Sequence, residues 1–210
     1  MKNLFRYIFI FSQFCILSCS NNIKNESQND NNPSVDSIGK HYRDSLSSEY
    51  NNSGNMKRLA QDYQGAVVDY TKAIGITSMF HINEDVELNS LSNRGYSKFK
   101  LQDYTGAIPD FSKVIEMGPE LAQYQYGISY YFRGLSKLNL QDYNGTIADF
   151  NMIIEMDPKY SRGVLKEEVY YYRGFTKLKL NQKDNACLDL SKAGEMGYGQ
   201  AYELIKQYCN

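Results

Sequence analysis

A pattern of small and large residues recurs about every 40 residues along most of this chain, and it limits what the chain can fold into. Its first member is a glycine, found at Gly54, Gly95, Gly134 and Gly174, so the intervals are 41, 39 and 40 residues. A small residue follows each glycine after twelve positions, at Ala66, Ala107, Thr146 and Ala186. A large apolar residue follows after sixteen, at Tyr70, Phe111, Phe150 and Leu190. A fixed period of this length is typical of repeat proteins.

The apolar residues within a repeat are spaced for helices. In the second copy, Ala107, Phe111, Val114 and Ile115 are separated by four, three and one positions, which fits one face of a helix and not the alternation of a strand. We expect each repeat to be a helical hairpin whose glycine and small residue let two helices cross closely, while the large residues fill the wider gaps. Such a hairpin leaves an apolar face on each side, so the hairpins must stack.

Further residues recur between these positions. Gln-Asp-Tyr stands at 61–63, 102–104 and 141–143, and Glu-Met-x-Pro stands at 116–119 and 155–158. An apolar or aromatic residue precedes each repeat glycine by four positions, at Tyr50, Leu91, Tyr130 and Tyr170. The pattern resembles the tetratricopeptide repeat. This resemblance implies an all-α superhelix of helical hairpins, with four repeats at about 47–80, 88–121, 127–160 and 167–198 in a domain spanning 41–210.

The chain departs from the usual repeat in three places. Extra residues precede each new first helix, at about 81–87, 122–126 and 161–166, which predicts longer first helices or longer loops. Pro109 lies near the expected start of a second helix and predicts that this helix starts late, because proline is harmless only in the first turn. Residues 192–201 resemble the turn of the related Sel1-like repeats, which implies a capping helix at 199–209.

The first 18 residues have the organisation of a signal peptide. Lys2 and Arg6 precede about eleven mostly apolar residues from Tyr7 to Leu17, too few to span a bilayer as a helix. The stretch ends in Ile-Leu-Ser-Cys at 16–19, which resembles the lipobox of bacterial lipoproteins. The resemblance implies that Cys19 becomes the lipid-bearing first residue of the mature protein. The alternative is a plain secretory signal cut nearby.

Residues 19–40, here called the tether, are predicted to be flexible. The segment is rich in asparagine and has hardly any apolar residue to bury, so it cannot offset the entropy cost of ordering. We therefore expect an exported protein that a lipid holds at a bacterial envelope membrane, facing the periplasm or the cell surface.

Composition argues against several classes of function. With 23 Lys+Arg against 24 Asp+Glu, the net charge is -1, which gives no overall attraction to nucleic acid. His41 and His81 lack neighbouring ligands, so neither a metal site nor a cofactor is expected. The sequence has no Gly-rich phosphate loop and no nucleophile elbow, and we do not expect an enzyme.

The cysteines allow one disulfide. In an exported chain, Cys187 and Cys209 are the only thiols left besides Cys19, and an oxidising compartment favours their pairing. The alternative is that Cys187 is a small core residue and Cys209 a surface one, because the sequence does not give the distance between them.

The resemblance also implies a binding surface, because tetratricopeptide stacks hold peptides or partner proteins on the surface formed by their first helices. The groove positions that correspond here are Tyr96, Phe99, Tyr131, Leu135, Tyr171 and Phe175. They favour an apolar or aromatic peptide over a C-terminal carboxylate, since Phe132 and Tyr172 replace polar residues of the carboxylate-binding subtype. The alternative is that several of these side chains pack between neighbouring repeats.

One charged residue also recurs with the repeat. Arg94, Arg133 and Arg173 each precede a repeat glycine. These arginines either bind an acidic segment of a partner or pair with carboxylates of adjacent repeats. We favour the second, structural role. Asp149 is expected on the solvent side of its helix.

These observations predict a non-catalytic scaffold or adaptor that binds another protein or a peptide. The alternative is a structural spacer in an envelope assembly complex, without a dedicated groove.

Overall fold

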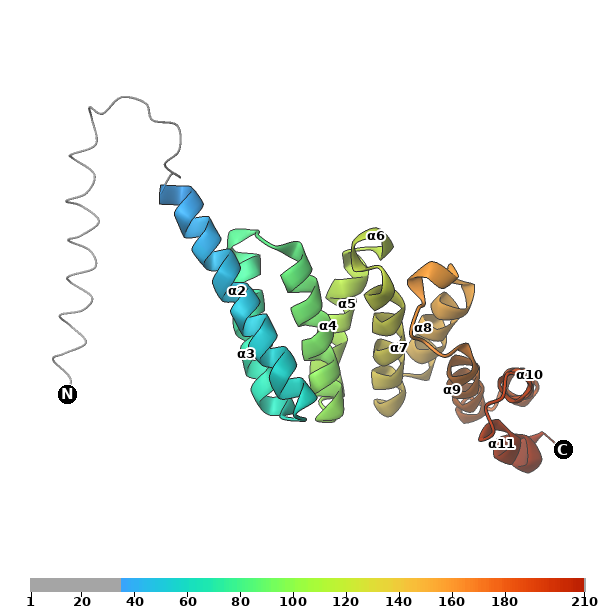
Figure 1. Cartoon of the computed structure of the whole chain (residues 1–210). Coiled ribbons are helices and arrows are strands. Elements are labelled where there is room, and N and C mark those ends of the chain that lie inside the picture. Colours follow the sequence, from blue (N-terminus) through green and yellow to red (C-terminus); the bar gives the residue numbers. More distant parts are fainter. Residues whose placement is uncertain (1–34, 210) are drawn as a thin grey trace, which may run out of the picture. The chain divides into compact units, whose positions relative to one another are not determined.

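The computed structural model describes residues 35–209, and all regular secondary structure in this range is helical (Figure 1). The helices are α2 (Val35–Leu59), α3 (Tyr63–Phe80), α4 (Glu84–Lys100), α5 (Tyr104–Glu116), α6 (Pro119–Ala122), α7 (Tyr124–Asn139), α8 (Tyr143–Glu155), the 3-10 turn η1 (Pro158–Tyr160), α9 (Lys166–Lys179), α10 (Lys183–Glu195) and α11 (Ala201–Tyr208). The signal peptide, Cys19 and most of the tether lie outside the described residues. Residues 35–40, at the end of the tether, are described and belong to α2. The prediction of a flexible tether is therefore wrong for these six residues.

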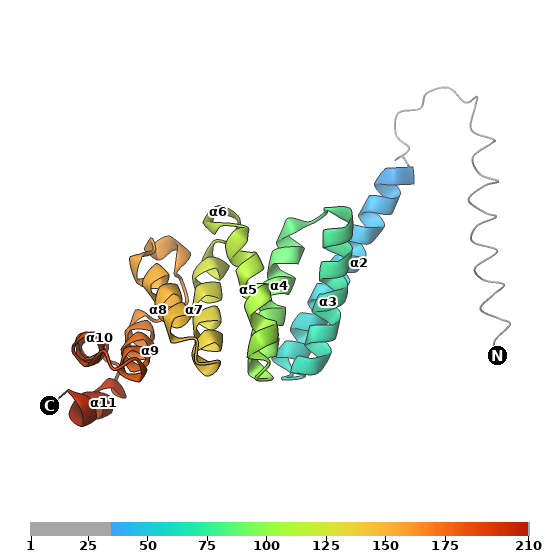
Figure 2. The same cartoon turned by 180° about the vertical axis from the view of Figure 1, so that it is seen from behind.

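The helices form four hairpins that stack in chain order. The hairpins are α2/α3, α4/α5, α7/α8 and α9/α10, and each packs on the next. The first helices α2, α4 and α7 lie in front of their partners in Figure 1, and the second helices come to the front when the view is turned in Figure 2. This arrangement confirms the predicted all-α solenoid of four tetratricopeptide-type repeats followed by a C-terminal helix.

The repeat glycines lie where two helices of one hairpin cross. A Cβ atom built on Gly134 would be 2.8 Å from Phe150 Cε1, and one on Gly54 would be 2.7 Å from Tyr70 Cε1. The large residue sixteen positions later therefore lies directly over the glycine and does not merely fill a wider gap. The large and small residues of this contact are all fully buried: Ala66, Tyr70, Ala107, Phe111, Thr146, Phe150, Ala186 and Leu190.

The turn within each of the first three hairpins is set by the recurring Gln-Asp-Tyr. The glutamine adopts a left-handed backbone conformation, with φ 62 at Gln102 and 63 at Gln141. The aspartate then caps the second helix: the Asp103 carboxylate accepts a hydrogen bond from the Gly106 N–H at 2.9 Å. The fourth hairpin keeps the left-handed residue, Asn181, but its cap residue Gln182 makes no side-chain capping bond.

The cap also explains why the predicted late start of the second helix in hairpin two is wrong. The helix α5 begins at Tyr104, directly after Asp103, and Pro109 lies inside it. Proline has no N–H, so the Thr105 carbonyl loses its usual helical partner. Both residues are exposed, and water can bind this carbonyl.

The extra residues between repeats form short loops and the beginnings of the next first helices. After hairpin one, residues 81–83 form a loop and residues 84–87 are the first turn of α4. After hairpin two the extra residues join the end of α6 (Pro119–Ala122) to the start of α7, and after hairpin three they form the loop that leads from η1 (Pro158–Tyr160) to α9. Only α2 is a markedly longer first helix, with 25 residues.

The C-terminal helix α11 packs on α10 at the end of the stack. The Tyr202 hydroxyl donates to the Gly194 carbonyl at 3.1 Å, and Ala201 is fully buried. Cys187 of α10 and Cys209 form a disulfide, with their Cα atoms 5.7 Å apart. The end of the stack is thus covered and covalently closed.

No helix within residues 35–209 has the length and apolar character needed to cross a membrane.

Candidate functional site

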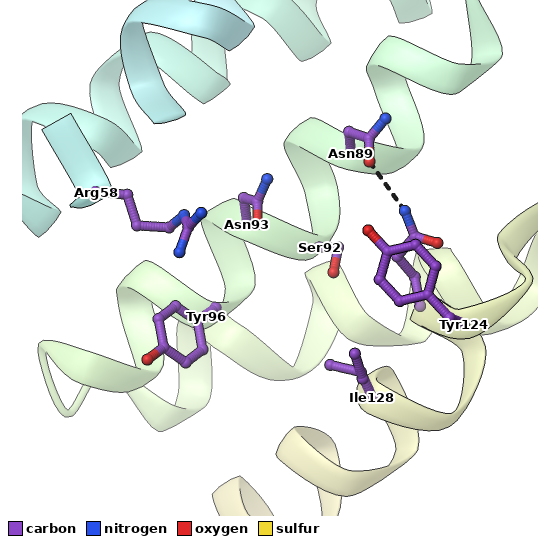
Figure 3. Close-up of a pocket in the computed structure, with 8 residues that line it drawn as sticks. Arg58, Asn89, Ser92, Asn93, Tyr96, Tyr124 and Ile128 are labelled. Carbon is purple, nitrogen blue, oxygen red and sulfur yellow. Dashed lines mark hydrogen bonds between the residues drawn. The ribbon is translucent and has the colours of Figure 1, made fainter. Parts of the chain in front are cut away.

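The face formed by the first helices, here called the first-helix face, carries two hollows. The first, here called the polar pocket, has a volume of about 150 Å³ and lies between α2, α4 and α7 (Figure 3). Its walls are Arg58, Asn89, Ser92, Asn93, Tyr96, Tyr124, Gln125 and Ile128. Most of these side chains carry hydrogen-bonding groups, so the pocket suits a polar or charged ligand group.

Hydrogen bonds between hairpins position the walls of the polar pocket. Gln125 Nε2 of α7 donates to Asn89 Oδ1 of α4 at 2.9 Å, the contact drawn in Figure 3. Asn93 Nδ2 of α4 donates to Asn55 Oδ1 of α2 at 3.0 Å. The Arg58 guanidinium lies 5.9 Å from the centre of the Tyr96 ring. The pocket is therefore built by three hairpins and depends on their stacking.

The second hollow, here called the apolar cleft, lies near the other end of the first helices and has a volume of about 500 Å³. It is lined by residues of α4, α7, α8 and α9 with the turn before α8: Phe99, Leu135, Leu138, Asn139, Gln141, Tyr143, Tyr172, Phe175 and Lys179. Lys179 Nζ lies 5.0 Å from the centre of the Phe175 ring. The aromatic and aliphatic side chains of the cleft suit a large apolar side chain of a partner, and Asn139, Gln141 and Lys179 add polar groups to its wall.

Four of the six candidate groove residues line one of the two hollows, and the other two line neither. Phe99, Leu135 and Phe175 line the apolar cleft, and Tyr96 lines the polar pocket. Tyr131 and Tyr171 line neither hollow. Leu138 and Tyr172, which were not among the six candidates, also line the apolar cleft.

Tyr131 packs between repeats, and Tyr171 packs against the turn that leads to α11. The Tyr131 hydroxyl donates to Glu168 Oε2 of the next hairpin at 2.6 Å, and its ring lies 6.3 Å from that of Phe150. The Tyr171 ring lies 4.8 Å from that of Tyr198, which precedes α11. Burial and the nearby Glu168 carboxylate raise the pKa of Tyr131 far above its usual value. These two tyrosines therefore hold neighbouring units together.

The repeated arginines form buried ion pairs within their own hairpins. Arg94 Nη2 lies 2.6 Å from Asp110 Oδ1, and Lys98 Nζ lies 2.8 Å from Asp110 Oδ2. The same arrangement recurs with Arg133, Lys137 and Asp149 and with Arg173, Lys177 and Asp189. The sequence interpretation favoured pairing between adjacent repeats, whereas the carboxylate comes from the same repeat.

Each arginine also reaches the preceding hairpin. Its Nη1 donates to a polar side chain on the second helix of that hairpin, namely Thr71 for Arg94, Ser112 for Arg133 and Asn151 for Arg173. The arginine thus joins two repeats. The role is structural, as favoured, and these cations are not available to a ligand.

The expectation that Asp149 faces solvent is wrong. Its side chain is only 3% exposed, because α7 covers it with Arg133 and Lys137. An aspartate recurs fifteen positions after each repeat glycine, and a lysine recurs three positions after the same glycine. This recurrence is the sequence signal that could have indicated a buried aspartate paired with the lysine.

The first hairpin has a variant of this arrangement. Ser53 replaces the arginine and donates to Asp69 Oδ2 at 2.6 Å, and Lys57 Nζ lies 2.7 Å from the same atom. Burial raises the pKa of Asp69, but the hydrogen bonds from Lys57 and Ser53 outweigh it, and the pKa lies below 3.8.

The remaining candidates add no further site. His41 and His81 are exposed, and residues 35–209 hold no group of three side chains that could bind a metal ion. Cys19 lies outside the described residues, so its lipidation is untested.

Comparison with known proteins shows similarity at the level of fold. No protein-family model matches the chain, and no curated protein matches it. A crystal structure of MamA protein is 19% identical, with a TM-score of 0.57 over 75% of this chain and 81% of that chain. A MamA RS-1 ArsTM double mutant is 18% identical, with a TM-score of 0.60 over 73% of this chain and 76% of that one.

A tetratricopeptide repeat protein from Parabacteroides merdae ATCC 43184 is 22% identical over 78% of this chain and 84% of that chain, and its TM-score of 0.43 is too low to support an argument. At such identities the similarity to the two MamA structures shows the fold alone. Together with the hairpin contacts described above, this similarity establishes that residues 40–209 form a solenoid of tetratricopeptide-type helical hairpins.

Proposed function

We propose that this protein is a non-catalytic scaffold that binds a peptide segment of another protein on its first-helix face, and that a lipid on Cys19 holds it at a bacterial envelope membrane. The observation that carries the binding function is the apolar cleft. Three consecutive hairpins contribute Phe99, Leu138 and Phe175 to it. An apolar side chain that fills the cleft removes these groups from water, which contributes about 25 cal/mol per Å² of buried apolar surface.

Export is supported by a separate observation. The disulfide between Cys187 and Cys209 closes the C-terminal end of the stack, and such bonds persist in oxidising compartments. The sequence at 16–19 supplies the attachment point for a lipid, and the tether supplies the spacing from the membrane.

Selection of peptides on the full chain tests the binding function. A random peptide library displayed on phage is selected against the protein, and the peptides obtained are then measured against the variant Leu138→Ser/Phe175→Ser. We expect a loss of affinity of at least tenfold, because two apolar walls of the cleft are removed. Leu188→Ser is the matched control, since Leu188 is an apolar residue of α10 that is 70% exposed and lies outside both hollows. Equal affinity for both variants would show that the selected peptides do not bind in the apolar cleft, and failure to select any peptide would favour the structural spacer instead.

Metabolic labelling tests the anchor. The chain is expressed in a bacterium with an alkyne-bearing fatty acid, and we expect label on the wild type and none on Cys19→Ala. Wild-type protein that carries no fatty-acid label and is found in the soluble extracellular or periplasmic fraction would indicate a plain secretory signal.

A further inference from the structure

A third hollow adjoins the polar pocket. It has a volume of about 370 Å³ and is here called the insert pocket, because most of its wall comes from the extra segments at 122–126 and 161–166. It is lined by Gln123, Tyr124, Ile128, Lys159, Arg162 and Gly163. Tyr124 and Ile128 of α7 also line the polar pocket. The two hollows therefore lie side by side with these two residues as a common wall. The surface that leads from one hollow over this wall to the other is here called the path.

The shared wall is apolar and accessible. Tyr124 is 50% exposed, and Ile128 is half-buried beside it. In Figure 3 both side chains lie on the side of the polar pocket opposite Arg58. An extended ligand that starts at Arg58 thus crosses an apolar surface before it reaches Lys159 and Arg162.

The path is positively charged at both ends. Arg58 lines the polar pocket, Lys159 and Arg162 line the insert pocket, and no carboxylate residue lines either hollow. Glu120 lies beside Lys159 and Arg162 in an adjoining hollow, where its carboxylate accepts a hydrogen bond from Tyr160.

These three cations differ from the repeated arginines. Arg94, Arg133 and Arg173 are each neutralised by a buried aspartate, whereas no direct ion pair of Arg58, Lys159 or Arg162 occurs among residues 35–209. The carboxylates of Glu120 and Asp157 nevertheless act on Lys159 from nearby, and Arg58 interacts with the Tyr70 hydroxyl. In addition, Arg58 Nε is buried and has no hydrogen-bond partner within that range. Arg58 and Arg162, which no carboxylate of the described residues pairs directly, are therefore suited to an anionic ligand, with Lys159 beside Arg162.

We propose that this path binds an extended segment of a partner protein in which an apolar residue lies between two acidic residues. The apolar side chain packs on Tyr124 and Ile128, one carboxylate pairs with Arg58, and the other pairs with Lys159 or Arg162. The inference rests on the proposed function and specifies the chemistry of the partner. It also gives a role to the residues that lengthen the third repeat.

The same peptide selection on the full chain tests this inference. We expect a class of selected peptides that carry Asp or Glu on both sides of an apolar residue and that bind with blocked termini. Their affinity should fall about fivefold in Arg162→Gln and in Arg58→Gln, and should fall further as salt is added. Lys113→Gln is the control, because Lys113 is an exposed cation of α5 that lies outside the path and its loss changes the net charge equally. Arg162 is exposed, so its substitution should not disturb folding.

The outcomes separate this inference from the proposed function. Peptides that depend on Leu138 and Phe175 but carry no acidic residues, or that bind Arg162→Gln unchanged, would overturn the inference and leave the scaffold function intact. Failure to select any peptide would overturn both. Binding to vesicles of anionic phospholipid that is lost in Lys159→Gln/Arg162→Gln, without acidic peptides, would assign these cations to a membrane surface and would also overturn it.

Discussion

Arg133 and Asp149 face each other across the two helices of the third hairpin and share two hydrogen bonds. Arg133 Nε donates to Asp149 Oδ2 at 3.0 Å and Nη2 donates to Oδ1 at 2.7 Å, while Nη1 reaches Ser112 of the preceding hairpin at 3.0 Å. One arginine thus fixes the angle between two helices and the position of the next repeat. The arrangement recurs in hairpins two and four.

Removing the carboxylate should therefore be costly. Asp149→Ala leaves Arg133 and Lys137 largely buried without a counter-charge, and we expect a loss of about 3 kcal/mol in the free energy of unfolding. Urea unfolding followed by circular dichroism measures it. Glu155→Ala, at an exposed position of the same helix, should change it by less than about 0.5 kcal/mol. Similar losses in the two variants would show that the ion pair contributes little.

Two glycine substitutions should have opposite effects. A methyl group on Gly134 would lie 2.8 Å from Phe150, so Gly134→Ala should destabilise the protein by about 1–3 kcal/mol. Gly75 lies within α3, and a methyl group there would meet no neighbouring atom within 4 Å, so Gly75→Ala should stabilise by about 0.5–1 kcal/mol through helix propensity. Thermal unfolding of both variants and the wild type shows whether each substitution raises or lowers the melting temperature. A stabilising Gly134→Ala would contradict the close helix crossing.

Reduction of the disulfide should loosen the C-terminal end first. Cys187 and Cys209 are separated by 22 positions, and closing a loop of this size contributes about 3 kcal/mol in the chain-entropy model. Under reducing conditions, or in Cys209→Ser, we expect faster amide hydrogen exchange in α11 and the end of α10, with hairpins one and two unchanged. Uniformly faster exchange would mean that the stack unfolds as one unit.

High pH should destabilise the protein through its buried and partly buried tyrosines. Burial, followed by the neighbouring Tyr172 and Glu168, raises the pKa of Tyr198 to about 12, and burial with a hydrogen bond to Tyr126 raises that of Tyr130 to about 12. A group whose pKa is higher in the folded state contributes stability that is fully present below its unfolded pKa of about 10 and is lost as the pH rises towards 12.

The measurement is the urea midpoint between pH 8 and 12. It should fall steadily above pH 10 in the wild type. The fall should be smaller in Tyr131→Phe, because burial and Glu168 raise the pKa of Tyr131 as well and phenylalanine cannot ionise. An unchanged slope in this variant would show that Tyr131 is not a source of the pH dependence.

The repeat, the helical hairpins and the covered end of the stack could all be predicted from the amino-acid sequence. These features depend on interactions between residues close in the chain, such as the cap that Asp103 gives to α5, or on a contact that the period repeats four times, such as Gly134 beneath Phe150. The resemblance to the tetratricopeptide repeat also placed Phe99, Leu135 and Phe175 on the face where the apolar cleft lies.

The sequence did not show which residues of a helix face are covered by other helices. This follows from how the helices pack on one another. Tyr131 and Leu135 lie one turn apart on α7, yet Tyr131 bonds to Glu168 of the next hairpin while Leu135 lines the cleft. Asp149 precedes Phe150 on α8 and is buried because Arg133 and Lys137 reach across from α7. Helical spacing gives the direction of a side chain from its own axis, but the covering residue comes from another helix, whose crossing angle and displacement depend on all the packed side chains between them.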